Sequence, residues 1–288
     1  MKLKRVLLCV VMVLCCFLNT ACGASVPPGN TGDEVILTEG DLIAEITIEG
    51  YGTMKFKLFP DIAPQAVDNF QKLCEKKYYD GLKIHRILKD SFIQGGSLNG
   101  DGTGGEALIN TTGYFPNEVS ADARHFYGAL TYANLNGQNT TQFAIVTSKK
   151  LHDLTQYDPA KIKEKAAEYT AAKEGLDNTD PYLEELTYHE TRFTALADMI
   201  SGASKEIIKK YAETTGGLPE MDGSNTVFGQ IFEGQDILSK LSEAQVSTNN
   251  FGEVSRPVED IVISSARVTV YHEPEPEPEP ETSSKKKK

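Results

Sequence analysis

The stretch Ile84-His85-Arg86-Ile87-Leu88-Lys89-Asp90-Ser91-Phe92-Ile93-Gln94-Gly95-Gly96 decides the fold. It reads as two short, mainly apolar strands joined by a turn at Lys89-Asp90-Ser91 and followed by paired glycines. Arg86 stands out, because a guanidinium keeps its proton and needs an acceptor when it lies among apolar neighbours. Two interpretations remain open: Arg86 pairs with a carboxylate at a sheet edge, or it faces a ligand.

Two later stretches form an ordered pattern with the first. They are Ala129-Leu130-Thr131-Tyr132-Ala133-Asn134 followed by Thr141-Gln142-Phe143, and Met221-Asp222-Gly223-Ser224-Asn225-Thr226-Val227-Phe228-Gly229. Together the three stretches resemble the signature of the cyclophilin family of peptidyl-prolyl cis/trans isomerases, and the resemblance covers residues 40–148 and 220–270. It implies a mainly β fold, a closed eight-stranded antiparallel barrel capped by two helices.

The resemblance also implies a chemistry. Rotation about an Xaa-Pro bond breaks amide resonance, a barrier of roughly 18–20 kcal/mol. In the twisted state the imide nitrogen gains a lone pair, so a donor aimed at that nitrogen or at the proline carbonyl favours this state over both planar ones. By resemblance, Arg86 is the catalytic donor. The substrate groove is expected to contain His85, Phe92, Gln94, Gly102, Ala133, Asn134 (through its backbone), Gln142, Ala144, Met221 and Asn225.

The expected groove departs from the family pattern in its apolar walls. Ser91 stands where an aromatic residue is usual, and Ala144 replaces a second aromatic residue. Each Å² of apolar surface missing from these walls weakens the grip on a proline ring by about 25 cal/mol. Phe92 and Met221 refill part of this area. We therefore expect an isomerase of reduced or altered activity; the alternative is a peptide-binding or holdase chaperone module of the same fold with little or no turnover.

Composition and spacing restrict the other ligands. A formal net charge of -12 argues against a nucleic-acid partner, because phosphate binding needs a basic face. The glycine-rich segment 95–105 lacks the lysine of a phosphate-binding loop. Counted with Asn99 as position one, the twelfth position is Asn110, where a calcium loop has glutamate. His152 and His189 lack the paired spacing of a zinc site. No cofactor and no metal are expected.

The N-terminus has the features of an export signal. Three basic residues precede an apolar run, 6–18, which is short for a membrane span and typical of a signal-peptide core. Asn19-Thr20-Ala21-Cys22 resembles a bacterial lipoprotein processing site, which implies that Cys22 carries lipid. The expected location is extracytoplasmic, anchored to the bacterial cell membrane, with secretion as the alternative. The expected partners are proline-containing segments of exported proteins, and a monomer is expected.

The remaining segments follow from composition. Residues 1–22 are the signal, 23–33 a flexible tether, 34–271 the cyclophilin-like domain and 272–288 a disordered tail of Glu-Pro repeats and lysines. A charged insertion at about 150–219 has helical spacing over 158–174, 181–200 and 204–214. It returns the chain to Met221, so we expect a helical subdomain beside the groove. Cys74 is expected to be a buried structural thiol on the apolar face of a helix.

Overall fold

A computed structural model of the protein describes residues 29–31 and 34–274. The predicted signal peptide, Cys22, most of the tether and nearly all of the tail lie outside these residues. Within the described part of the chain, no helix has both the length and the apolar character needed to cross a bilayer.

Eight antiparallel strands form a closed barrel, which confirms the predicted fold. Buried and less buried positions alternate along its first two strands, as expected for a sheet with one face inward. Around the barrel the order is β1 (Leu42–Ile48), β12 (Ile261–Val270), β3 (Lys83–Leu88), β4 (Phe92–Gly95), β8 (Phe143–Val146), β6 (Ala129–Tyr132), β9 (Val227–Glu233) and β2 (Gly52–Leu58). Two short ribbons lie outside it: β5 (Phe115–Pro116) with β7 (Gln138–Asn139), and β10 (Val246–Thr248) with β11 (Val254–Pro257).

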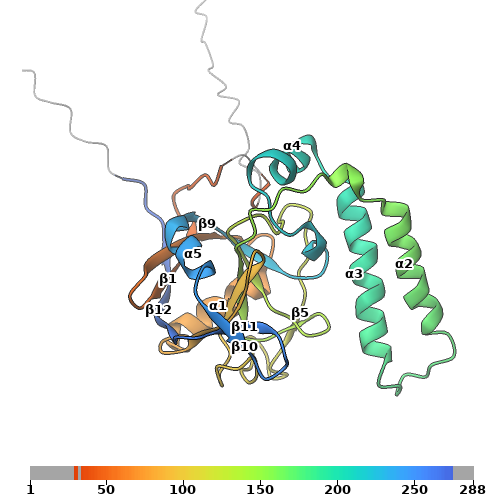
Figure 1. Cartoon of the computed structure of the whole chain (residues 1–288), viewed down its shortest axis with the longest axis horizontal. Helices are drawn as coiled ribbons and strands as arrows, with labels where there is room; N and C mark the ends of the chain where they lie inside the picture. Colours follow the sequence, from red (N-terminus) through yellow and green to blue (C-terminus); the bar gives the residue numbers. More distant parts are fainter. Residues whose placement is uncertain (1–28, 32–33, 275–288) are drawn as a thin grey trace, which may run out of the picture.

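Two helices lie against the barrel (Figure 1). Both contribute side chains to its core. α1 (Pro64–Glu75) packs against β12, and α5 (Gln235–Ser242) packs against β2 and β4. Pro64 occupies the first turn of α1, where its missing N–H leaves no helical bond unmade. Phe70 from α1 contacts the rings of Tyr79, Phe143 and Phe228. Cys74 is buried on the same helix as a free thiol, as predicted.

The insertion forms a helical hairpin beside the barrel (Figure 1). α2 (Pro159–Ala172) and α3 (Leu183–Ser201) pack against each other, and Asp158 caps α2 by accepting from the backbone N–H of Ala160. The predicted third helix, 204–214, is only α4 (Lys205–Lys209) followed by a π-helical turn, Lys210–Thr214. Short 3-10 turns at Leu154–Gln156 and Pro219–Met221 flank the insertion.

A buried polar network joins the insertion to the barrel at Asp222, which is 2% exposed. Its carboxylate accepts from Arg124 Nη1 at 3.3 Å, from the His125 backbone N–H at 2.9 Å and from the Tyr211 hydroxyl at 2.8 Å. Arg124, 1% exposed, also donates through Nη2 to the carbonyl of Met199 in α3. The return of the chain into the barrel is therefore fixed by hydrogen bonds as well as by packing.

Asn30 corrects one expectation for the tether. It lies within 23–33, yet it is 4% exposed. Its amide donates to the Arg124 carbonyl and to Gln230 Oε1, both at 2.8 Å, and it accepts from the Arg124 N–H. Lys210 of the insertion donates to the Asn30 carbonyl. The polar, glycine-rich composition of 29–31 predicts flexibility, but these hydrogen bonds hold Asn30 between barrel and insertion.

Candidate functional site

A groove of about 550 Å³ lies across β3, β4 and the loops that follow β6 and precede β9. Arg86 and Gln94 are paired neighbours on β3 and β4, and Gln94 in turn faces Ala144 on β8. The barrel register therefore brings together residues that are far apart in the sequence. All predicted site residues except His85 line this groove: Arg86, Phe92, Gln94, Gly102, Ala133, Asn134, Gln142, Ala144, Met221 and Asn225.

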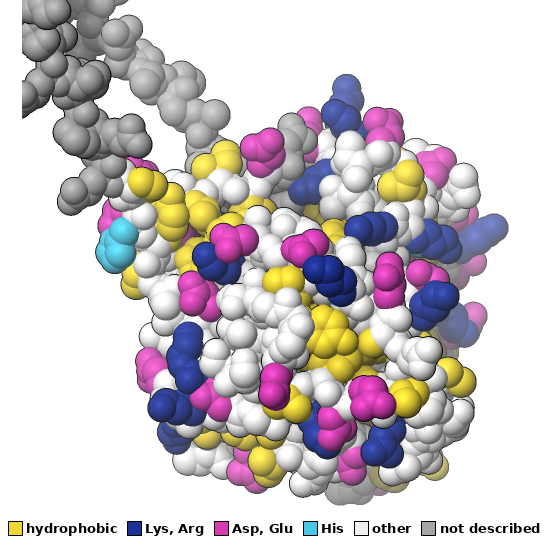
Figure 2. Space-filling view, turned by 60° about the vertical axis from the view of Figure 1, so that its left-hand side comes forward, with side chains coloured by type: hydrophobic (Ala, Val, Ile, Leu, Met, Phe, Trp, Pro, Cys, Tyr) yellow, Lys and Arg dark blue, Asp and Glu magenta, His cyan; other side chains and the backbone are white. Residues whose placement is uncertain are grey.

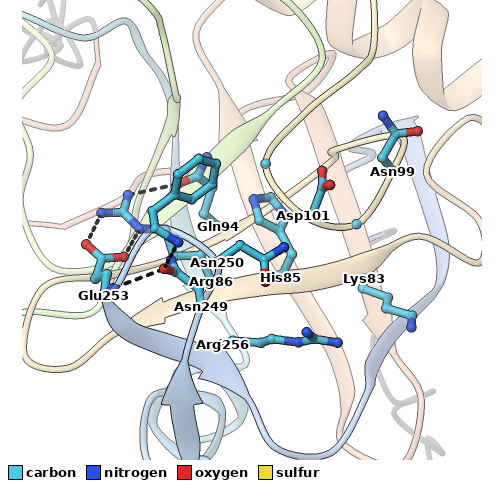
Figure 3. Close-up of a pocket in the computed structure, with 13 residues that line it drawn as sticks. Lys83, His85, Arg86, Gln94, Asn99, Asp101, Asn249, Asn250, Glu253 and Arg256 are labelled. Carbon is cyan, nitrogen blue, oxygen red and sulfur yellow. Dashed lines mark hydrogen bonds and ion pairs between the residues drawn. The ribbon is translucent and has the colours of Figure 1, made fainter.

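Arg86 forms a bidentate ion pair with Glu253, a residue to which no sequence motif points (Figure 3). Its Nε and Nη2 each donate to one carboxylate oxygen at 2.7 Å, and its Nη1 donates to Gln94 Oε1 at 3.1 Å. The guanidinium also lies over the Phe92 ring, 4.8 Å from its centroid. Hydrogen bonds from Arg86 lower the pKa of Glu253 to about 2, so this carboxylate is ionised at neutral pH.

The ion pair confirms the first interpretation of Arg86, pairing with a carboxylate, and still leaves part of the guanidinium unbonded within the described residues. A guanidinium carries five N–H groups, and the three bonds above leave one N–H on each Nη atom. The side chain is 30% exposed and lines the groove. Because the carboxylate occupies the Nε edge, the Nη end remains able to donate to a ligand.

A chain of side-chain amides continues from Arg86 along the groove. Since Arg86 donates to Gln94 Oε1, the Gln94 amide is oriented with its nitrogen toward Gln142 Oε1, at 3.0 Å. Gln142 then donates to the carbonyl of Gly102 at 2.9 Å. Each donor fixes the orientation of the next amide, so the polar side of the groove is ordered from Arg86 outward.

Apolar side chains line another part of the groove. Phe92 and Met221 are half-buried and pack on a cluster that includes Val146, Leu218 and Val227. The side chain of Asn134 donates to the Ser224 carbonyl and accepts from the Gly137 N–H. A contact between Asn134 and a bound peptide therefore falls to its backbone, as the resemblance implies.

His85 does not line the groove, and this part of the prediction is wrong. It lines a second cavity of about 560 Å³ on the other side of Arg86 (Figure 3). The pairing of β3 with β4 is irregular between Ile84 and Arg86, and His85 and Arg86 both line this second cavity. The imidazole is 8% exposed, and neither ring nitrogen has a partner among the described residues. Burial, together with the nearby charge of Arg86, lowers the pKa of His85 to about 4.

His85 predicts a specific loss of stability in acid. The unfolded chain binds a proton at His85 below a pH of about 6.5, whereas the folded protein binds it only near pH 4. Stability should fall by on the order of 3 kcal/mol as the pH drops through this window, from 1.36 kcal/mol per pKa unit. The contribution of Glu253 is lost only below about pH 4.5.

The measurement is urea unfolding of the wild type and His85→Gln at pH 7, 5.5 and 4.5. The variant should lose much less stability on acidification than the wild type. Parallel decreases in the two proteins would show that His85 is not the group responsible.

Other chemistries find little support within the described residues. No group of three or more His, Cys, Asp or Glu is arranged to hold a metal ion there. The side chain of Asp101 in the glycine-rich loop accepts from the N–H and hydroxyl of Thr103, as in an ordinary turn. Burial raises the pKa of the Cys74 thiol to about 12, which suppresses the nucleophilic thiolate at neutral pH.

Comparison with known proteins gives consistent results. Residues 43–268 match the sequence family described as "Cyclophilin type peptidyl-prolyl cis-trans isomerase/CLD". A Staphylococcus haemolyticus protein named "Putative peptidyl-prolyl cis-trans isomerase" is 35% identical over 219 residues, 75% of this chain and 86% of that protein. A Staphylococcus epidermidis protein of the same name is 34% identical over 219 residues, 75% of this chain and 87% of its own.

A solved structure resembles the fold as well. The crystal structure of a Cryptosporidium parvum cyclophilin-type peptidyl-prolyl cis-trans isomerase superposes with a TM-score of 0.52 at 20% identity. The match covers 81% of this chain and 99% of that one. At this identity the likeness concerns the fold alone.

Proposed function

The chain belongs to the family of cyclophilin-type peptidyl-prolyl cis-trans isomerases, and on that basis we propose that it accelerates Xaa-Pro rotation in exported proteins with Arg86 as the donor. The observation that carries the proposal is the geometry of Arg86. Its Nη end keeps two N–H groups beyond those bonded to described residues, and Arg86 borders a groove that is lined in part by the apolar side chains of Phe92 and Met221. Such a groove suits a proline ring on one side and a twisting imide on the other.

Arg86 can supply only part of the required lowering of the rotation barrier, and the rest of the groove must supply the remainder. Bringing a relaxation time of tens of seconds down to milliseconds requires a factor of about ten thousand, or roughly 5–6 kcal/mol. A hydrogen bond from a charged donor contributes about 1.5–3 kcal/mol. The remainder comes from holding the peptide in position, through the ordered amides of Gln94 and Gln142 and the contacts of Phe92 and Met221.

The direct test is isomerisation of a short Ala-Pro peptide by the chain without its first 22 residues. We expect exchange between cis and trans peptide signals to become much faster with the protein than without it. If isomerisation is not accelerated but unfolded proteins are still kept soluble, the barrel acts as a holdase and the enzymatic proposal fails.

One observation favours peptide holding as a second function. A cavity of about 830 Å³ lies between α3 and the loop 134–138, lined in part by Val119, Leu183 and Tyr188. The insertion reaches this loop directly, because Gln138 donates to Glu184 at 2.7 Å and Tyr188 lies beside Gly137. The same loop borders the proline groove on its other side, so the two hollows are neighbours.

The loop between the proline groove and the cavity along α3 exposes an apolar side chain. Leu135 is 78% exposed and lines the proline groove, whereas the next residues, Asn136 and Gly137, line the second cavity. An extended polypeptide with its proline in the groove would therefore contact Leu135 and then enter the cavity along α3. This continuity supports a role for the insertion in binding the flanking chain of a client.

Shortening the hairpin tests this role. Two contacts join α2 to α3: the Lys163–Asp198 ion pair near the base of the hairpin and the Tyr169–His189 ring stack nearer its tip. Replacing 167–193 by a short Gly-Ser linker removes the α3 wall of the cavity and keeps the buried residues Leu196 and Met199. We expect refolding of a proline-limited protein to slow at least fivefold, while turnover of a tetrapeptide changes less than twofold.

Both rates should be measured on the same preparation, with thermal unfolding as the check that the barrel is intact. An equal loss in the two assays would contradict a client-binding role for the hairpin.

The partner class follows from the surface and the N-terminus. On the face shown in Figure 2, acidic and basic side chains are interspersed, without an extended basic field. This supports a polypeptide partner over a nucleic acid.

We propose anchoring through lipid on Cys22 at the outer face of the bacterial membrane, supported by the sequence 19–22. Mass spectrometry of membrane-extracted protein tests it: an unmodified, unprocessed N-terminus would contradict anchoring.

A further inference from the structure

We propose that Glu253 is a positioning residue for the isomerase reaction, fixing the Arg86 guanidinium so that its Nη end points into the groove. The proposal rests on the proposed function of Arg86 and goes beyond it. Glu253 lies 167 residues further along the chain and belongs to none of the three stretches that carry the resemblance. The two carboxylate oxygens take the Nε and Nη2 positions of one guanidinium edge, at 2.7 Å each.

Glu253 is itself held in place by a tight turn. Its backbone N–H donates to Asn249 Oδ1 at 3.0 Å, and its carbonyl accepts from the Asn249 N–H at 2.8 Å. The Asn249 side chain also donates to Ser255 at 3.1 Å. The turn joins β10 to β11, and β11 packs against β3, the strand that carries Arg86. The hydrogen bonds of Asn249 thus fix the backbone of the turn that carries the Glu253 carboxylate.

Three contacts together define the guanidinium plane. Glu253 holds one edge and Gln94 accepts from Nη1 (Figure 3). The Phe92 ring lies against one face. Removing Glu253 deletes two of the three hydrogen bonds and allows the long side chain to sample other orientations. The amides of Gln94 and Gln142 take their direction from Arg86, so their order should weaken as well.

Preorganisation of this kind should affect turnover more than substrate binding. A planar imide offers no nitrogen lone pair, so the Arg86 contact strengthens only as the bond twists. A misaligned guanidinium therefore lowers kcat and leaves KM nearly unchanged. We expect Glu253→Ala to lower kcat for an Ala-Pro peptide about tenfold, with KM within twofold. Glu253→Asp, which keeps the charge on a shorter side chain, should recover part of the loss.

Two further measurements separate positioning from a general structural effect. In a double-mutant cycle, Glu253→Ala should cause no additional loss on an Arg86→Ala background. By NMR, the Arg86 Nε–H signal should exchange slowly with water in the wild type and at least tenfold faster in Glu253→Ala. The matched control is Glu259→Gln, which removes one charge from an exposed glutamate close by in sequence and should leave both readouts unchanged.

The outcomes distinguish the two proposals. If Arg86→Ala is inactive while Glu253→Ala keeps wild-type kcat, or gains activity because the guanidinium is less neutralised, the positioning role is overturned and the isomerase stands. A tenfold loss that persists on the Arg86→Ala background also overturns it. If the wild type itself gives no turnover, the proposed function fails, and unchanged Nε–H exchange in Glu253→Ala would then refute the positioning as well.

Discussion

Replacing Arg86 by alanine should lower kcat/KM for an Ala-Pro peptide about a hundredfold, with most of the loss in kcat. A hundredfold corresponds to about 2.7 kcal/mol, within the range of about 1.5–3 kcal/mol for a hydrogen bond from a charged donor. Each Nη atom keeps one N–H beyond its bond to a described residue, and Arg86 lines the groove. We expect these N–H groups to act on an acceptor that forms only as the imide twists. Exchange NMR on the peptide gives both kcat and KM.

Arg267 provides a matched control. It also makes a bidentate pair, donating through Nη1 and Nη2 to Asp80 at 2.8 and 2.7 Å, and its side chain is 39% exposed against 30% for Arg86. Arg267 lines none of the groove. Arg267→Ala should therefore keep kcat/KM within about twofold, as expected for an ion pair away from the site. Equal losses in the two variants would refute a catalytic role for Arg86.

Replacing Asp222 by alanine should lower the free energy of unfolding by about 3–5 kcal/mol. Removing this carboxylate leaves the guanidinium of Arg124, 1% exposed, without its counter-charge. It also strips an acceptor from the His125 N–H and from the buried Tyr211 hydroxyl. Because Tyr211 belongs to the insertion, the loss should loosen the junction between insertion and barrel.

Urea unfolding checks this prediction, and two further variants serve as references for the size of the stability loss. Tyr211→Phe removes a single bond to the carboxylate and should cost about 1.5–3 kcal/mol. Asp236→Ala removes an exposed pair with Lys240 one helical turn away and should cost about 0.3–0.5 kcal/mol. A loss below about 1 kcal/mol for Asp222→Ala would mean that the network is hydrated and adds little to stability.

Local pattern predicts individual strands, and the resemblance implies the barrel and most of its groove. Alternation along 42–48 and 54–58 marks which side chains enter the core, and the structure buries them accordingly. The resemblance places Arg86, Gln94 and Gln142 on one groove because the three motifs occupy fixed strands of the barrel. The same reasoning fails at His85, because the pairing of β3 with β4 shifts register between Ile84 and Arg86, and His85 lines the second cavity together with Arg86.

The strands can be read from the chain alone, because burial periodicity is a local property. The barrel and the assignment of Arg86 as the candidate donor follow from the resemblance of three short motifs, which are also local in sequence. The partners of the charged groups emerge only in the folded molecule: Glu253 for Arg86, Arg124 and Tyr211 for Asp222, and Asn30 for the junction with the insertion. The difference lies in the range of the interactions. An ion pair depends on two side chains meeting within about 3 Å, and segments far apart in the chain meet only when the barrel closes.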